Sequence, residues 1–514
     1  MSHQLPAKPN LEHLKKQAKQ LLHDFELDDP TAIEQFRSLA SVSLAPKLAD
    51  AQHVIAREYG FANWATLKEH VDSLTRRLTP FELLCAAIRA SDAARVAGVL
   101  ERYPELREKI DDPLPDYGFG QHALFAAVQR SDQATIDVLL HAGANIQKRT
   151  EWWAGGFGLL DDCDKSLVEF LTERGAVLDA HSASRLGMFA KLREFVAADL
   201  SVVHARGGDG QTPLHYASTI EIAEFLLANG ADIDAKDVDH ESTPAQYMLR
   251  VGQARHFPAD RKPIARYLVA RGCRTDILMA AALGDMGLVR RHLQTDPASI
   301  RTRVDEEYFP KQDPRSGGTI YLYSLGRYRT PHQVARDFGH EEIFQFLMRQ
   351  SPADVKLEQA CELGDEELFR TLLGSRPDMV QNLSDADRRR LTDAAQNNNT
   401  AAVRLMLGAG WPVDTKGEYN MTPLQWAAWH GNAEMVREIL RYRPGLELRD
   451  NDHGITALGS ALHGSMNGWH RDRGDYVATV EALLDAGAKA PPVSDDLEAS
   501  DSVRDLLRRR GETQ

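Results

Sequence analysis

The chain has 514 residues, of which 43% are hydrophobic and 26% are charged, and its formal net charge is −14. A single hydrophobic core stops growing at roughly 250–300 residues, so this length predicts several domains or an elongated stack of repeated units. The acidic balance argues against nucleic acid and against an anionic membrane surface as the main partner, because both attract positive charge.

The N-terminal region predicts a small helical domain over residues 1–76. Residues 10–25 and 48–74 have the periodicity of short amphipathic helices. We expect no secretory signal, because the start lacks an apolar core, and no run reaches the ~20 apolar residues of a membrane span. The four cysteines form no C-x-x-C pair, which argues against a zinc site or a disulfide framework. Reduced thiols favour a cytoplasmic location.

One pattern recurs along the rest of the chain. A Thr-Pro pair begins at Thr212, Thr243, Thr330 and Thr422. In the C-terminal half, leucines separated by 34, 33 and 34 residues lead successive copies, at Leu357, Leu391, Leu424 and Leu458. A fixed period of this size is typical of stacked supersecondary units, each of which completes the hydrophobic core of its neighbour.

The copy at residues 207–238 predicts a pair of short helices. Thr212 is expected to cap the first helix, with Pro213 at its first position. The apolar stripe of that helix extends to Ile220, and the second helix is predicted to start at Glu221. Gly230 is predicted to end the second helix in a left-handed conformation.

This copy resembles the ankyrin repeat through Gly210, Thr212, Pro213, Leu214, His215, Ala217, Leu226, Leu227, Gly230, Ala231 and Asp232. Residues 421–440 resemble it about as well. The resemblance implies an all-α solenoid of about ten to twelve stacked helix pairs over residues 80–492, some of them degenerate and some with long loop insertions. Residues 493–514 are expected to form a polar cap or tail. The N-terminal domain resembles the helical leader of some bacterial ankyrin proteins.

Four segments interrupt the repeat, and we expect them to carry function, because insertions in such stacks form loops that often line the binding face. They are residues 151–164 (EWWAGGFGLLDDCD), 251–262, 301–330 and 463–476. The third is about as long as a whole repeat, and its TIYLYSL run (319–325) favours one arm of a hairpin.

These segments and the adjoining turns supply the candidate ligand-binding residues. Flat rings with polar neighbours suit sugars or a peptide with apolar anchors. The candidates are Trp152, Trp153, His240, Tyr321, Trp426, Trp429, His463, Trp469, His470 and Asp472. The tryptophans either line a shared aromatic groove or fill gaps between repeats. Asp209, Asp232 and Asp237 are expected only to shape the turns.

Four acids are candidates for catalysis, namely Asp239, Glu241, Glu306 and Glu307. A pair of carboxyl groups cleaves a glycoside when they stand about 5–5.5 Å or 6.5–9.5 Å apart. No metal site is expected, because the spacing of His463, His470 and Asp472 fits no zinc motif. No cofactor is expected either, because the sequence has no phosphate- or dinucleotide-binding motif.

Two functions of different classes stay open, and the sequence leaves catalysis undecided. The resemblance implies a recognition scaffold that binds a partner protein or ligand through its concave face and inserted loops. The alternative is a carbohydrate-active, glycoside hydrolase-like enzyme whose aromatic and acidic site is built from the interruptions. Convergence of the interruptions on one deep pocket would favour the enzyme, and a shallow open groove would favour the scaffold.

Overall fold

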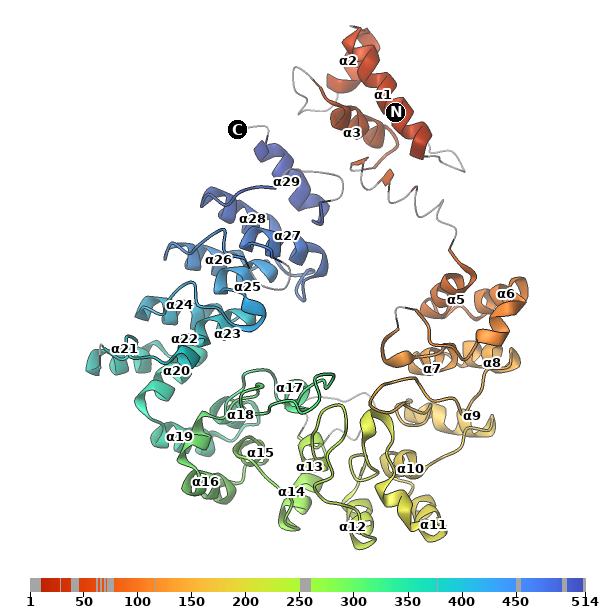
Figure 1. Ribbon diagram of the computed structural model, residues 1–514, viewed down its shortest axis with the longest axis vertical. Coiled ribbons are helices and arrows are strands. Elements are labelled where there is room, and N and C mark those ends of the chain that lie inside the picture. The colour runs from red at the N-terminus through yellow and green to blue at the C-terminus, as the bar shows by residue number, and fades with distance from the viewer. Residues whose placement is uncertain are drawn as a thin grey trace. The chain divides into compact units, whose positions relative to one another are not determined.

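The computed structural model describes residues 11–27, 29–37, 46–61, 63–64, 67–68, 71, 78–115, 117–249, 260–376, 378–449, 454–491 and 497–511. Within these ranges every regular element is a helix, and one isolated bridge joins Pro113 to His122. The predicted all-α solenoid of stacked helices is confirmed (Figure 1). The interruption at 251–262 lies mostly outside the described residues.

The chain divides into two compact units. The first comprises residues 1–82 together with 491–498 and 507–514. Its helices are α1 (Leu11–Glu26), α2 (Pro30–Arg37) and α3 (Leu48–Glu58). Leu14, Ala18 and Leu21 recur every three or four residues along α1 and are buried in one cluster with Val54 and Trp64. The amphipathic pattern of this region therefore folds as a small helical core.

The second unit comprises residues 83–490 and 499–506. Its helix pairs follow one another in chain order (Figure 1). The helices are α5 (Pro80–Arg89), α6 (Ala93–Arg102), α7 (Ala123–Gln129), α8 (Gln133–His141), α9 (Val168–Glu173), α10 (Ala180–Leu186), α11 (Phe189–Ala198), α12 (Ile220–Ala228), α13 (Pro244–Tyr247), α14 (Lys262–Ala270), α15 (Ile277–Leu283), α16 (Met286–Thr295), α17 (Tyr321–Ser324), α18 (Pro331–Asp337), α19 (Glu341–Gln350), α20 (Ala353–Leu363), α21 (Glu366–Ser375), α22 (Asp385–Arg388), α23 (Arg390–Gln396), α24 (Thr400–Ala409), α25 (Pro423–Trp429), α26 (Ala433–Leu440), α27 (Ala457–Asn467) and α28 (Tyr476–Asp485), with α29 (Asp501–Gly511) near the C-terminus.

The Thr-Pro pairs start helices as predicted at three of their four positions. Thr243, Thr330 and Thr422 precede α13, α18 and α25, and in each case the proline takes the first helical turn. A glutamine three residues after each threonine accepts a hydrogen bond from the threonine backbone N–H, as in Thr422 N to Gln425 Oε1 at 2.8 Å. At Thr330 and Thr422 the threonine hydroxyl in turn accepts from the glutamine backbone N–H at 3.3 Å. This reciprocal capping satisfies backbone donors that the first turn of a helix leaves open.

The fourth Thr-Pro pair behaves differently from the prediction. Residues 213–216 form one hydrogen-bonded turn that does not continue into a helix, and His215 stands where the other copies have glutamine. The His215 Nδ1 accepts from the Thr212 backbone N–H at 3.0 Å. The next helix, α12, starts at Ile220 and is capped by the Thr219 hydroxyl, so Ile220 does not belong to a first helix. Gly230 ends α12 with φ +93°, as predicted.

The long insertion also departs from expectation. Residues 319–325 do not form an arm of a hairpin, because Tyr321–Ser324 is the short helix α17. Tyr321, Ser324 and Leu325 are buried, and this spacing of three and four residues matches one face of a helical turn. In the interruption at 463–476, residues 463–467 extend helix α27.

Candidate ligand-binding site

A cavity of about 690 Å³ lies among the turns that join successive repeats of the second unit, and we call it the turn cavity. Its lining comes from residues 119–129, 152–162, 209–216, 239–248 and 315–324, together with Arg261. Three of the four interruptions therefore contribute to the same cavity, namely 151–164, 301–330 and, through Arg261, 251–262. The volume lies within the range of about 300–1,000 Å³ that is usual for ligand sites.

Backbone hydrogen bonds connect one turn to the next beside this cavity. The Asp209 N–H donates to the carbonyl of Gly155 at 3.1 Å, and the Val238 N–H donates to the carbonyl of Asp209 at 2.8 Å. The Gly317 N–H then donates to the carbonyl of Asp239 at 3.0 Å. Because each bond joins a different segment of the chain, the turns are held in fixed register around the cavity.

Two glycines permit this close approach. A Cβ atom on Gly208 would overlap the Phe157 ring, and one on Gly155 would overlap the carbonyl oxygen of Gly207. Gly155 also has φ +132°, a conformation that residues with a side chain rarely adopt. The glycines of both segments are therefore explained by packing between turns, and phosphate binding is not needed to account for them.

Arg185, on α10, holds the first interruption in place through hydrogen bonds to its backbone. Its side chain is fully buried, and its guanidinium donates to the carbonyls of Leu160 at 2.9 Å and Cys163 at 3.1 Å. A buried guanidinium is stable only when its donors are satisfied. The degenerate repeat at residues 181–197 thus replaces an apolar position by an arginine that fixes the 160–163 segment.

Aromatic rings form much of the cavity wall. The Phe119 ring lies 4.7 Å from Trp152 and 6.2 Å from Phe157, measured between ring centroids. Trp152 in turn contacts Trp153 at 6.2 Å. The guanidinium of Arg315 stacks over the Trp153 ring at 4.4 Å, so the insertion contributes a cation–π contact next to the cavity.

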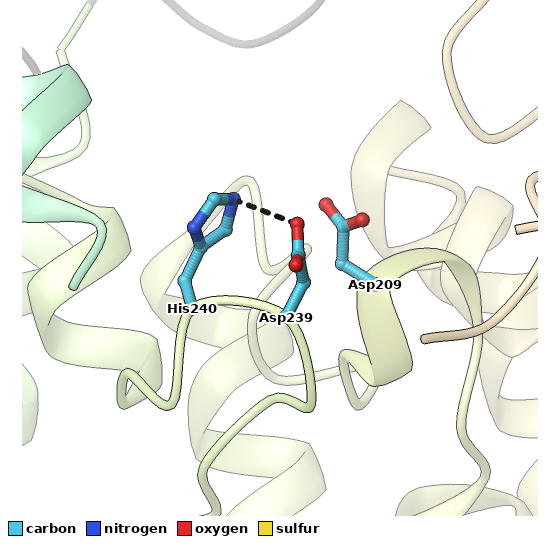
Figure 2. Close-up of side chains that lie close together, drawn as sticks. All are labelled: Asp209, Asp239 and His240. Carbon is cyan, nitrogen blue, oxygen red and sulfur yellow. Dashed lines mark ion pairs between the residues drawn. The ribbon is translucent and has the colours of Figure 1, made fainter. Parts of the chain in front are cut away.

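Three polar side chains lie close together in this wall (Figure 2). One ligand-type atom from each of Asp209, Asp239 and His240 lies within 4.8 Å of the other two. Burial outweighs the opposing effect of His240 and, together with the neighbouring Asp239 carboxylate, raises the pKa of Asp209 to about 7. A carboxyl group removed from water resists ionisation unless a positive charge is near, which explains the direction of this shift.

The insertion docks onto the same turn. The Glu241 carboxylate accepts from the backbone N–H groups of Gln312 and Asp313, each at 2.8 Å. His240 Nδ1 lies 3.0 Å from the carbonyl oxygen of Gly318. Glu241 therefore positions the insertion, and its carboxylate is committed to that contact.

The structure separates the remaining predicted residues from the turn cavity. Tyr321 is fully buried and donates to Asp276 at 2.9 Å, so its ring is part of the core. Glu306 forms an ion pair with Lys311 at 3.1 Å, and its side chain is 62% exposed. Glu307 is 54% exposed and lies 3.7 Å from Arg303. Of the four predicted acids, only Asp239 lines this cavity.

A second group of predicted residues forms what we call the C-terminal aromatic cluster, made of Trp426, Trp429, His430, His463, Trp469 and His470. Trp469 is 64% exposed and stacks over Trp426, which is 3% exposed, with 5.8 Å between centroids. The Trp429 and His463 rings lie 5.4 Å apart, and those of His430 and His470 lie 5.1 Å apart. The predicted Asp472 side chain is 91% exposed. Trp426 thus fills a gap between repeats, and Trp469 covers it.

The sequence reasoning missed the rings of Phe119, Phe157, Tyr216 and Tyr247 and assigned Asp209 a purely structural role. The repeat register held a usable signal. Asp209 and His240 each stand three residues before the threonine of a Thr-Pro pair. Equivalent positions of successive repeats are neighbours in a stack, so the repeat register predicts that these two side chains lie close together.

The comparison with known families agrees with this architecture. A family model for ankyrin repeats in three copies matches residues 357–452 and 391–491, and the model for a single ankyrin repeat matches residues 209–238. The chain is an ankyrin repeat protein. Ankyrin repeats support the function of a protein-interaction scaffold for this chain.

One similar protein is the palmitoyltransferase AKR1 of Kluyveromyces lactis, which is 33% identical over 109 residues. The match covers 21% of this chain and 14% of that relative. The chain therefore matches only a small part of the transferase's length. Among the residues that the structure describes, no helix combines the length and the apolar character needed to cross a bilayer.

Proposed function

We propose that this ankyrin repeat protein recognises a partner protein by holding an extended segment of it at the turn cavity. The observation that carries the proposal is the convergence of three repeat interruptions on one cavity lined by aromatic rings and carboxylates. The rings would receive an apolar or aromatic anchor side chain of the partner. Asp162 and Asp209, which also line the cavity, would accept hydrogen bonds from backbone N–H groups of the partner.

The placement of the four acids predicted for catalysis favours recognition over hydrolysis, although Asp161, Asp162 and Asp209 also line the cavity. Glycoside cleavage needs two carboxyl groups on either side of the bond, and three of the four predicted acids lie away from this cavity or are held by backbone groups. The convergence on one cavity is nevertheless the arrangement expected for the carbohydrate-active alternative. That alternative therefore remains the second candidate, with Asp239 as its acid.

A peptide selection tests the proposal. Random peptides displayed on phage are selected on the full chain, and the affinities of the selected peptides are measured for the wild type, Trp152→Ala, Tyr323→Ala and the control Trp469→Ala. Tyr323 lines the cavity and is 59% exposed, so its removal should not disturb the fold. We expect a shared apolar anchor, at least a tenfold loss of affinity in the two cavity variants, and no change in the control.

Two results would count against recognition at this cavity. The first is that no peptide is enriched, and the second is that the selected peptides lose affinity only in Trp469→Ala. Hydrolysis of chromogenic glycosides by the wild type, but not by Asp239→Asn, would instead support the carbohydrate-active alternative.

A further inference from the structure

The wall of the turn cavity contains three side chains that converge on one point. Asp209 comes from one inter-repeat turn, and Asp239 and His240 come from the next (Figure 2). Their ligand-type atoms all lie within 4.8 Å of one another. Two carboxylate oxygens and one imidazole nitrogen form a donor set that suits a divalent transition metal ion, whereas Mg²⁺ and Ca²⁺ favour oxygen donors alone.

The contacts of His240 fix which of its nitrogens can bind a metal. A carbonyl oxygen only accepts hydrogen bonds, so the Nδ1 atom that lies 3.0 Å from the Gly318 carbonyl carries the proton. In the neutral ring Nε2 then holds a lone pair. A histidine that ligates a metal through one nitrogen usually donates the N–H of its other nitrogen to a backbone carbonyl or carboxylate. This hydrogen bond sets both the tautomer and the ring orientation.

The His240 Nε2 atom faces a carboxylate. It lies 3.6 Å from Asp239 Oδ2, and the Asp239 side chain is only 7% exposed. A lone pair that faces a buried anion is unfavourable, so either a proton or a metal ion has to lie between the two atoms. The other oxygen of this carboxylate, Oδ1, accepts from the Gly317 backbone N–H at 3.1 Å. Residues 317–318 of the insertion therefore hold both Asp239 and His240 from behind.

Asp209 supplies the third donor and an independent indication of a ligand. Its Oδ1 atom is buried and makes no hydrogen bond of regular geometry among the described residues. The Trp152 indole N–H, which is also buried without a partner of regular geometry, acts on the same carboxylate. A buried acceptor that lacks a partner is unfavourable, and more so when it is charged. Asp209 also lines the turn cavity together with Asp239 and His240, so a bound ion would have open coordination positions facing that cavity.

We propose that Asp209, Asp239 and His240 bind a divalent transition metal ion, with Zn²⁺ as the probe that tests the site. Zn²⁺ binds oxygen and nitrogen donors at about 2.0–2.2 Å, so small side-chain rotations would bring the three atoms onto one ion. The ion would compensate the buried negative charge, and its remaining positions would take water or a donor atom of a ligand in the cavity. This site does not depend on partner binding.

Isothermal titration calorimetry of the metal-free full chain with Zn²⁺ tests the proposal. We expect one saturable site, and at least a 30-fold weaker affinity in Asp209→Asn and in Asp239→Asn, which keep the side-chain shape but remove the charge. Asparagine tolerates the left-handed backbone of Asp209, where φ is +55°. Thermal unfolding without metal should show that both variants are folded, and added Zn²⁺ should raise the unfolding temperature of the wild type alone.

The matched control is His470→Ala, because the His430 and His470 rings lie 5.1 Å apart and offer an unrelated pair of nitrogens. This variant should keep the affinity of the wild type. The proposal is overturned if the wild type shows no saturable Zn²⁺ binding, if both asparagine variants bind as tightly as the wild type, or if only His470→Ala loses the site. No partner is present in the titration, so its failure would leave the peptide selection unaffected.

Discussion

Single side chains that depart from the repeat pattern hold the turn cavity together. Glu241 accepts two backbone hydrogen bonds from the insertion, and Arg185 donates to two carbonyls of the first interruption. At this scale, therefore, the irregular residues stabilise the irregular segments, and their substitution should affect those segments first.

The first prediction at this scale concerns Arg185→Met, which keeps most of the side-chain volume but removes the donors. The buried carbonyls of Leu160 and Cys163 would lose their partner, so we expect the free energy of unfolding to fall by about 3 kcal/mol. Urea denaturation followed by circular dichroism measures this change.

The control for this prediction is Arg274→Met, because the Arg274 side chain is 83% exposed. Its effect should stay within about 0.5 kcal/mol, as is usual for surface substitutions. Equal stabilities of the two variants would show that Arg185 does not anchor the first interruption.

At the scale of elements, the sequence predicted best where the repeat is regular. The caps at Thr243, Thr330 and Thr422 and the helices that follow them could be predicted, because capping depends on residues close together in the sequence. The turn cavity could not, since its contacts join segments such as 155 and 209 or 239 and 317, which local periodicity does not connect. Helix α17 was mistaken for a strand because alternating aromatic residues fit both periods over so short a run.

Several of these elements contain buried histidines, which make the stability of the fold depend on pH. Burial lowers the pKa of His332 and of His430 to about 4 and that of His215 to about 3. Folding therefore favours the neutral ring. This contribution to stability is present above the ordinary pKa near 6.5 and is lost as the pH falls towards about 4.

We therefore expect the free energy of unfolding to fall between pH 6.5 and pH 4, by up to about 3 kcal/mol for a histidine such as His332. Urea midpoints measured across this range should fall less steeply for His332→Gln, whose amide can still reach the Ser351 hydroxyl that His332 contacts at 2.8 Å. His141→Gln, at an exposed site, serves as the control and should follow the wild type. Identical pH profiles for His332→Gln and the wild type would contradict this account.

At the scale of the whole molecule, the repeats supply the hydrophobic core and their interruptions supply much of the wall of the turn cavity. One core cluster of the second unit runs from Ala180 to Met348 through successive helix pairs, and it includes Tyr321 of the insertion. The insertion is thus packed into the array at one end and docked onto the 237–242 turn at the other. The central claim is that this double attachment makes the turn cavity a fixed site within an otherwise regular stack.

Hydrogen–deuterium exchange of the full chain, read by mass spectrometry, tests that claim most directly. Peptides that contain the amides of Asp209, Val238 and Gly317 should be protected in the wild type, because each amide donates to a neighbouring turn. Glu241→Ala should raise the exchange of residues 312–320 and leave residues 421–440 unchanged. Exchange of residues 312–320 at the rate of an unstructured peptide in the wild type would contradict the claim.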